Sequence, residues 1–95
     1  MKKYEIMYIL LADLGEEERK TVMDNMHKII TDLNGKILSV DVENWGLRDF
    51  AYPINDLTKG YYVVIEVEAD SKALNEFDRL AKLNTNVLRH LVIAK

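Results

Sequence analysis

The sequence predicts an α+β fold in which two helices cover one face of a four-stranded antiparallel sheet. Three observations support it: two segments carry apolar residues at helical spacing, four segments have strand-like patterns, and these segments follow one another in the order βαββαβ. Right-handed crossovers place both helices on the same face, the ferredoxin-like arrangement, with the second and fourth strands at the edges. A chain of 95 residues suits a single binding domain covering residues 1–95.

The first strand is predicted over residues 3–11, where apolar residues occupy both faces, as is typical of a central strand. Asp13 and Glu16 have the spacing of a capping box, so the first helix should be capped by Asp13 and cover about residues 15–33. The Asn-Gly dipeptide at 34–35 should end it. Its apolar face repeats every three or four residues and consists of Val22, Met26, Ile29, Ile30 and Leu33.

The second strand is expected to run from residue 36 to about residue 50 and to lie at an edge of the sheet. Gly46 permits a bulge within it, and Pro53 lacks the N–H that a ladder needs, so the strand should end near that proline. Residues 55–60 are rich in turn formers and should link it to a third strand over residues 61–68.

The second helix is expected to be capped by Asp70 or Ser71 and to end near Asn84, and a last strand over residues 87–94 completes the sheet. Alternation along the first and third strands places six side chains on the face without helices: Glu5, Met7, Ile9, Tyr62, Val64 and Glu66. This mixture favours a docking surface for a protein or an RNA over scattered exposure of single residues.

Composition narrows the possible functions. The chain has no cysteine, which excludes disulfides and thiolate chemistry and suits a reducing cytoplasm. Its longest apolar run, residues 6–12, is too short to span a bilayer, and no signal peptide is recognisable, so no membrane partner is expected. The net charge of −3 means that any RNA binding requires a local basic patch or a basic partner.

Catalysis has little support in the sequence. His27 and His90 lie in different elements, and neither has the spacing of a metal site. The loop after the first strand carries Glu16, Glu17 and Glu18, which repel anionic substrates. We therefore expect no catalytic residue, no metal, no cofactor, no small-molecule substrate and no enzymatic activity.

Basic residues near the sheet edges are the candidate contacts to RNA phosphate, although each single lysine is also explained as an ordinary solvated charge. They are Lys2, Lys3, Arg48, Lys59, Arg89, His90 and Lys95. The strand that begins at Lys59 and Gly60 partly resembles an RNA-recognition-motif strand. Glu66 stands in that segment where a stacking ring would lie, so base stacking on this face is not expected.

The segment from Trp45 to Ile54 is suited to binding a partner. It holds the only tryptophan and the only proline of the chain, together with Arg48 and Tyr52. An edge strand offers unpaired backbone groups, and tryptophan, tyrosine and arginine are the residues most often central to protein interfaces. A structural role remains open for Trp45 as a plug over a helix end and for Tyr52 as part of a strand stop.

Three segments resemble the family of bacterial small-subunit ribosomal protein six. They are Gly-Leu-Arg-Asp-Phe-Ala-Tyr-Pro-Ile at 46–54 with Lys-Gly-Tyr-Tyr at 59–62, the opening Met-Lys-Lys-Tyr-Glu-Ile at 1–6, and Asn-Val-Leu-Arg-His-Leu-Val-Ile at 86–93. The resemblance covers essentially the whole chain. Phe50 stands where the family usually has leucine, and Asp49 where many members carry a basic residue.

The resemblance implies a structural component of the small ribosomal subunit in the cytoplasm, with no reaction catalysed. It implies binding to the central domain of 16S ribosomal RNA as a heterodimer with small-subunit ribosomal protein eighteen, a small basic protein. Residues on the edge strand that suit such a partner are Glu43, Trp45, Arg48, Asp49 and Tyr52. The alternative is a ferredoxin-like ligand-binding or regulatory domain that self-associates through its sheet.

Overall fold

The computed structural model describes residues 2–54 and 57–95, apart from the side chains of residues 43–44, 50–54 and 57. The order is βαββαβ, as the sequence predicts. The elements are β1 (Lys2–Leu11), α1 (Glu16–Asp32), β2 (Lys36–Ile54), β3 (Leu57–Ala69), α2 (Ser71–Leu83) and β4 (Val87–Ala94).

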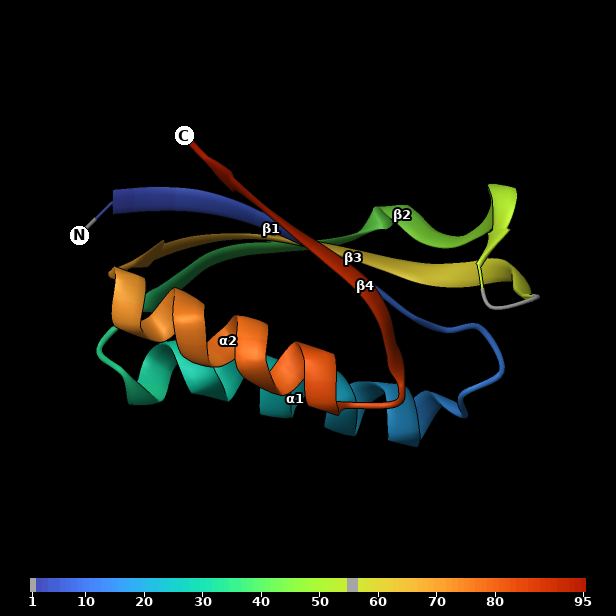
Figure 1. Ribbon diagram of the computed structural model, residues 1–95, viewed down its shortest axis with the longest axis horizontal. Coiled ribbons are helices and arrows are strands. Elements are labelled where there is room, and N and C mark those ends of the chain that lie inside the picture. Colours follow the sequence, from blue (N-terminus) through green and yellow to red (C-terminus); the bar gives the residue numbers. More distant parts are fainter. Residues whose placement is uncertain (1, 55–56) are drawn as a thin grey trace.

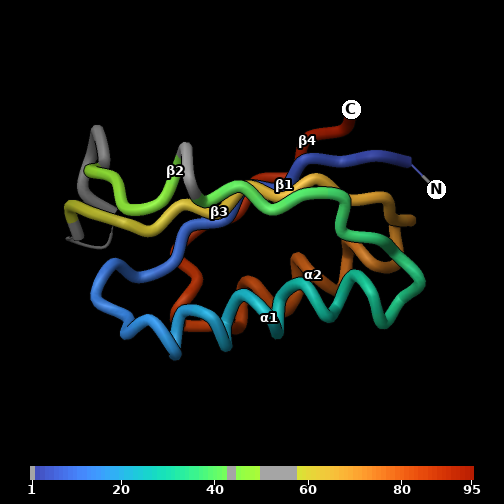
Figure 2. Tube along the Cα trace, turned by 180° about the vertical axis from the view of Figure 1, so that it is seen from behind, coloured from blue at the N-terminus to red at the C-terminus, as the bar shows by residue number. Residues whose placement is uncertain are grey.

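The strands form one antiparallel sheet in the order β2-β3-β1-β4, and both helices lie against the same face of it (Figure 1). The ferredoxin-like arrangement is therefore confirmed, with β1 and β3 in the centre and β2 and β4 at the edges. The long β2 pairs with β3 in separate stretches, because the register shifts between Asp41 and Gly46 and again between Asp49 and Ile54. The distal part of the β2–β3 hairpin reaches past the ends of the helices (Figure 2).

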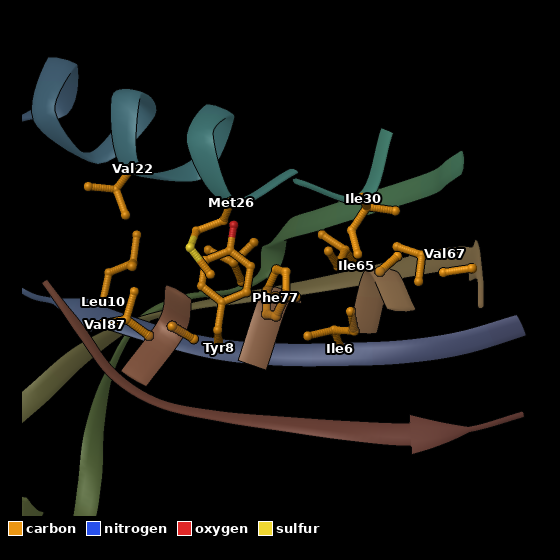
Figure 3. Packing of buried hydrophobic residues seen from close by; sticks show 14 residues of the cluster. Ile6, Tyr8, Leu10, Val22, Met26, Ile30, Ile65, Val67, Phe77 and Val87 are labelled. Atoms are coloured by element: carbon orange, nitrogen blue, oxygen red, sulfur yellow. The ribbon is translucent and has the colours of Figure 1, made fainter. Parts of the chain in front are cut away.

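The core lies between the helices and the inward face of the sheet (Figure 3). Tyr8 and Phe77 are the largest fully buried side chains, and their rings meet edge to face with centroids 5.9 Å apart. The remaining fully buried large side chains come from the central strands and α1: Ile6, Leu10, Met26, Ile30, Val63, Ile65 and Val67. The alternation predicted for β1 and β3 is therefore the alternation that builds the core.

The ends of the helices correct one prediction and confirm two. The capping box predicted at Asp13 is wrong: α1 begins at Glu16 after Gly15, whose extended backbone provides no side-chain cap. Asp70 does cap α2, because its carboxylate accepts a hydrogen bond from the backbone N–H of Ala73 at 3.1 Å. The predicted stop at 34–35 is also correct, since α1 ends at Asp32 and Asn34 adopts φ = +68°. A Cβ on Gly35 would lie only 2.8–2.9 Å from two backbone oxygens.

The turn predicted over residues 55–60 is too long. β3 already begins at Leu57, four residues before the predicted start, and β2 continues as far as Ile54. The predicted turn at residues 55–56 lies outside the described residues. The hairpin is therefore longer than expected, because backbone pairing resumes between Ile54 and Leu57 after the register shift.

A partly buried hydrogen bond joins β1 to α1. The hydroxyl of Tyr8 lies 2.6 Å from Nε2 of His27, and the two rings meet edge to face. Burial lowers the pKa of His27 below its ordinary value of 6.5, although the carboxylate of Asp24 opposes the shift. Burial also raises the pKa of Tyr8, so the hydrogen bond joins a neutral phenol to an imidazole that burial keeps neutral.

Because of His27, we expect the free energy of unfolding to decrease in acid. The unfolded chain protonates His27 at about its ordinary pKa of 6.5, whereas the folded chain resists protonation until a lower pH. The free energy of unfolding should therefore fall as the pH drops below 6.5 toward the pKa of the folded state. Urea denaturation of the wild type and of His27→Gln across this range provides the check. The slope should be shallower in the variant, and equal slopes would contradict the assignment.

Candidate interaction surface

The face of the sheet turned away from both helices, here called the helix-free face, is mainly apolar in its centre. The pairing places Leu91, Met7 and Val64 in one row across β4, β1 and β3. Leu91 is 55% exposed and Ile93, two residues further along β4, is 47% exposed. Val64 is only 8% exposed although it lies on this face. A packed apolar centre beside exposed aliphatic side chains is the character of a docking surface.

Three side chains from the edge strand β2 and its neighbour β3 stack on this face. The rings of Trp45 and Tyr62 lie 6.1 Å apart at an angle of 21°, and the guanidinium of Arg48 lies 4.8 Å from the centre of the Trp45 ring. Arg48 Nε also donates to the backbone oxygen of Trp45 at 3.3 Å. This Tyr62–Trp45–Arg48 stack fixes an aromatic surface next to a positive charge. Trp45 is half-buried and Arg48 exposed, so the outer end of the stack is open to solvent.

The backbone of β2 places Trp45 in this stack. Gly46 adopts φ = +57°, a left-handed conformation that glycine tolerates and other residues rarely adopt. It follows the register shift that begins after Asp41, the second of three in β2, and lies opposite Tyr62. The bulge permitted by Gly46 in the sequence is therefore a real irregularity, and it brings the tryptophan beside the tyrosine of the neighbouring strand.

The opposite face of the same hairpin carries a second cation–aromatic contact. Tyr61 points toward the helices, and the guanidinium of Arg19 from α1 lies 4.1 Å above the centre of its ring. Tyr61 and Tyr62 are neighbours in β3, so consecutive residues are covered on opposite faces of the sheet. Arg19 thus ties the hairpin to α1 on one face, while the Trp45–Tyr62 contact joins its two strands on the other.

Two carboxylates lie side by side further along the helix-free face. Glu5 and Glu66 are direct cross-strand partners on β1 and β3. The ammonium of Lys95 lies 2.5 Å from Glu66 and 3.7 Å from Glu5. The hydrogen bond to Glu66, with smaller contributions from Glu5, raises the pKa of Lys95 above its ordinary value. The lysine therefore acts as the counter-ion of both carboxylates.

The predicted RNA-binding residues do not form one continuous patch. Arg89 is exposed and lies opposite Ile9, in the same row as Tyr62, while Arg48 lies across from Gly60. Lys2 and Lys3 sit at the other end of β1, roughly 20–30 Å from these arginines at the rise of an extended strand. Lys59 lies opposite Asp49 in the hairpin, so an acidic residue is its cross-strand neighbour.

His90 lies on the helix side of the sheet instead of joining the other basic residues. Its Nε2 donates to a carboxylate oxygen of Asp78 at 2.5 Å, its ring packs against Phe77, and its side chain is 14% exposed. Hydrogen bonds from His90 and Lys82 lower the pKa of Asp78. This position gives no support to a contact between His90 and phosphate. The histidine instead connects β4 to α2 through its contacts with Asp78 and Phe77.

The residues predicted to meet a protein partner are only partly described. Trp45 and Arg48 are brought together in the stack, and Asp49 is exposed one residue further along β2. The side chains of Glu43 and Tyr52 lie outside the described residues. The sequence places Tyr62 and Glu66 on the correct face but does not indicate that one belongs to the stack and the other to the Lys95 pair.

Neither a metal-ligand cluster nor a helix able to span a membrane is found in the part of the chain that the structure describes. Within residues 2–54 and 57–95, no group of three histidine, aspartate or glutamate side chains is placed to hold a metal ion. Among the helices of the same residues, none is long and apolar enough to cross a membrane. The described features are those of contact surfaces: an aromatic stack, an apolar sheet face and a neutralised pair of carboxylates.

Comparison with known proteins gives a consistent result. A family described as ribosomal protein S6 matches residues 3–94. Among solved structures, the chain is similar to the 30S ribosomal protein S6 of Thermotoga maritima, with 30% sequence identity and a TM-score of 0.91. The match covers 99% of this chain and 87% of the Thermotoga chain.

Proposed function

The chain belongs to the ribosomal protein S6 family, and from this premise we propose that it binds the central domain of 16S ribosomal RNA as a heterodimer with small-subunit ribosomal protein eighteen. Its role is structural: as a small-subunit ribosomal protein it takes part in translation, and the proposed pair fixes the geometry of an RNA junction without catalysing a reaction. We place it in cytoplasmic ribosomes.

The observation that carries the partnership is the Tyr62–Trp45–Arg48 stack. Tryptophan, tyrosine and arginine are the side chains most enriched in the central residues of protein interfaces, and here the three are already stacked before a partner arrives. Preorganised side chains lose little conformational entropy on binding. We assign this stack to the protein partner, together with Asp49 and the Glu43 and Tyr52 positions of the same strand.

Contacts to RNA are assigned to exposed basic residues outside the stack: Lys2, Lys3, Lys59 and Arg89. Arg48 stands between the two groups, since its guanidinium can stack on Trp45 and still donate to a phosphate. These few cations must act against a net charge of −3. A basic partner that supplies most of the phosphate contacts resolves this difficulty.

The proposal predicts that RNA binding depends on the partner. A 16S central-domain fragment should bind the isolated chain weakly at physiological salt, and adding ribosomal protein eighteen should increase its retention by about tenfold or more. Filter binding at several salt concentrations measures both. The partner alone is the control for its own RNA affinity. Tight, steeply salt-dependent binding by the isolated chain would contradict the model.

The same preparation distinguishes the alternative function. A regulatory domain that pairs through its sheet should form dimers of its own, whereas the proposed function expects a monomer that pairs when the partner is added. Analytical ultracentrifugation of the isolated chain measures this directly. A stable self-dimer that ribosomal protein eighteen does not dissociate would favour the alternative.

A further inference from the structure

The pair of carboxylates formed by Glu5 and Glu66 is not explained by the folding of the sheet. Like charges directly opposite each other weaken an antiparallel pair of strands. The compensating Lys95 is exposed, and exposed ion pairs contribute little to stability. The ion pairs with Lys95 therefore stabilise the fold only slightly, whereas a binding surface can make fuller use of two acidic side chains here.

The surroundings of the pair resemble the centre of an interface. Ile93 occupies the same row on β4, and Met7 and Val64 follow in the next row. Glu5 is 31% exposed and Glu66 is 42% exposed, so a partner can reach both carboxylates. When a partner covers the apolar neighbours and excludes water, an ion pair between the two proteins becomes stronger than it is on the open surface.

The chemistry of the pair selects its occupant. Two adjacent carboxylates repel a phosphate, which argues against RNA at this position. They attract an ammonium or a guanidinium, and Lys95 already holds such a group between them. The apolar residues around them require the cation to stand on a surface that is itself partly apolar, as on a folded basic protein and not on a free metabolite.

We propose that Glu5 and Glu66 together bind a lysine or arginine side chain of the basic partner, and that Lys95 occupies this position until the partner arrives. This inference rests on the proposed function and extends it: the interface runs from the Tyr62–Trp45–Arg48 stack across the apolar rows to the carboxylate pair. Lys95 marks where the incoming cation sits and competes with it.

The test removes the negative charges while keeping the shape of the side chains. The double variant Glu5→Gln, Glu66→Gln should bind ribosomal protein eighteen at least about tenfold more weakly than the wild type, with a smaller dependence on salt. It should fold normally, because a repulsive cross-strand pair has been removed. Glu68→Gln is the matched control. It lies on the same strand opposite Lys3 and Lys36 and should change affinity less than about twofold.

Removal of Lys95 should change the affinity for the partner in the opposite direction, toward tighter binding. Lys95→Ala should bind the partner about two- to fivefold more tightly, because the carboxylates no longer have to release their own counter-ion. Isothermal titration calorimetry of the four proteins gives the affinities, and circular dichroism checks their fold. A lysine that only supports the sheet would instead weaken binding when it is removed.

The outcomes separate this inference from the proposed function. If the wild type binds ribosomal protein eighteen while the double variant and Lys95→Ala bind equally well, the cation contact is overturned and the partnership stands. If the wild type does not bind the partner, both are overturned. If the double variant binds the isolated 16S fragment much more tightly than the wild type does, this face contacts RNA and the inference fails.

Discussion

Trp45→Ala is expected to weaken binding of the proposed partner, small-subunit ribosomal protein eighteen, by about 2–4 kcal/mol while leaving the fold intact. The tryptophan contacts both Tyr62 and Arg48, so its removal abolishes both contacts and takes away an apolar surface. It is half-buried on an edge strand and does not belong to the core of the domain. The affinity should therefore change far more than the free energy of unfolding.

Fluorescence offers an independent reading of the same residue. Because Trp45 is the only tryptophan, its emission should shift to shorter wavelengths when the partner covers it, before any RNA is added. Lys82→Ala is a suitable control, since Lys82 is exposed on α2 and pairs with Asp78 on the opposite side of the sheet. An unchanged spectrum, together with unfolding of Trp45→Ala, would show that the tryptophan serves the fold.

The largest loss of stability is expected from Phe77→Ala, about 3–5 kcal/mol. Phe77 is fully buried and joins the centre of the sheet to α2, where its ring contacts Tyr8 and His90. An alanine leaves a cavity lined by groups that cannot close it, and the edge-to-face contact with Tyr8 is lost. Urea denaturation at neutral pH measures the loss.

The size of the side chain, and not its aromaticity alone, should dominate this effect. Phe77→Leu keeps most of the apolar volume and should cost less than half as much as the alanine variant. If both variants lost the same small amount, the centre of the core would have to lie elsewhere. Because the loss is a large fraction of the stability of a small domain, Phe77→Ala should also reduce the amount of folded protein available for assembly.

The fold was predictable because its apolar periodicities are strong. β1 is apolar on both faces and occupies the centre of the sheet, and the alternating residues of β3 build the core. The cap of α1 was not predictable from spacing: Asp13 and Glu16 fit a capping box, yet the helix starts after Gly15. The three consecutive glutamates of its first turn already suit the positive end of the helix.

The interaction surface was predictable by residue type but not by arrangement. Trp45 and Arg48 are recognisable as contact residues from the sequence, whereas their stacking on Tyr62 depends on a register shift in β2 that no local pattern reveals. The same limit applies to Lys95, whose distance from Glu66 is set by the pairing of β4 with β1. Contacts between strands follow from register, and register is decided by the whole sheet.

The contacts that cover Tyr61 and Tyr62 at the base of the β2–β3 hairpin have a mechanical consequence. Arg19 of α1 covers Tyr61 on one face, and Trp45 of β2 covers Tyr62 of β3 on the other, so the two strands are held to each other and to the first helix. Contacts on both faces oppose bending at the base of the hairpin, so a force on its far end is transmitted to the sheet. Because Arg19 belongs to α1, a force that RNA or a partner exerts on the tip reaches the helical layer as well as the sheet.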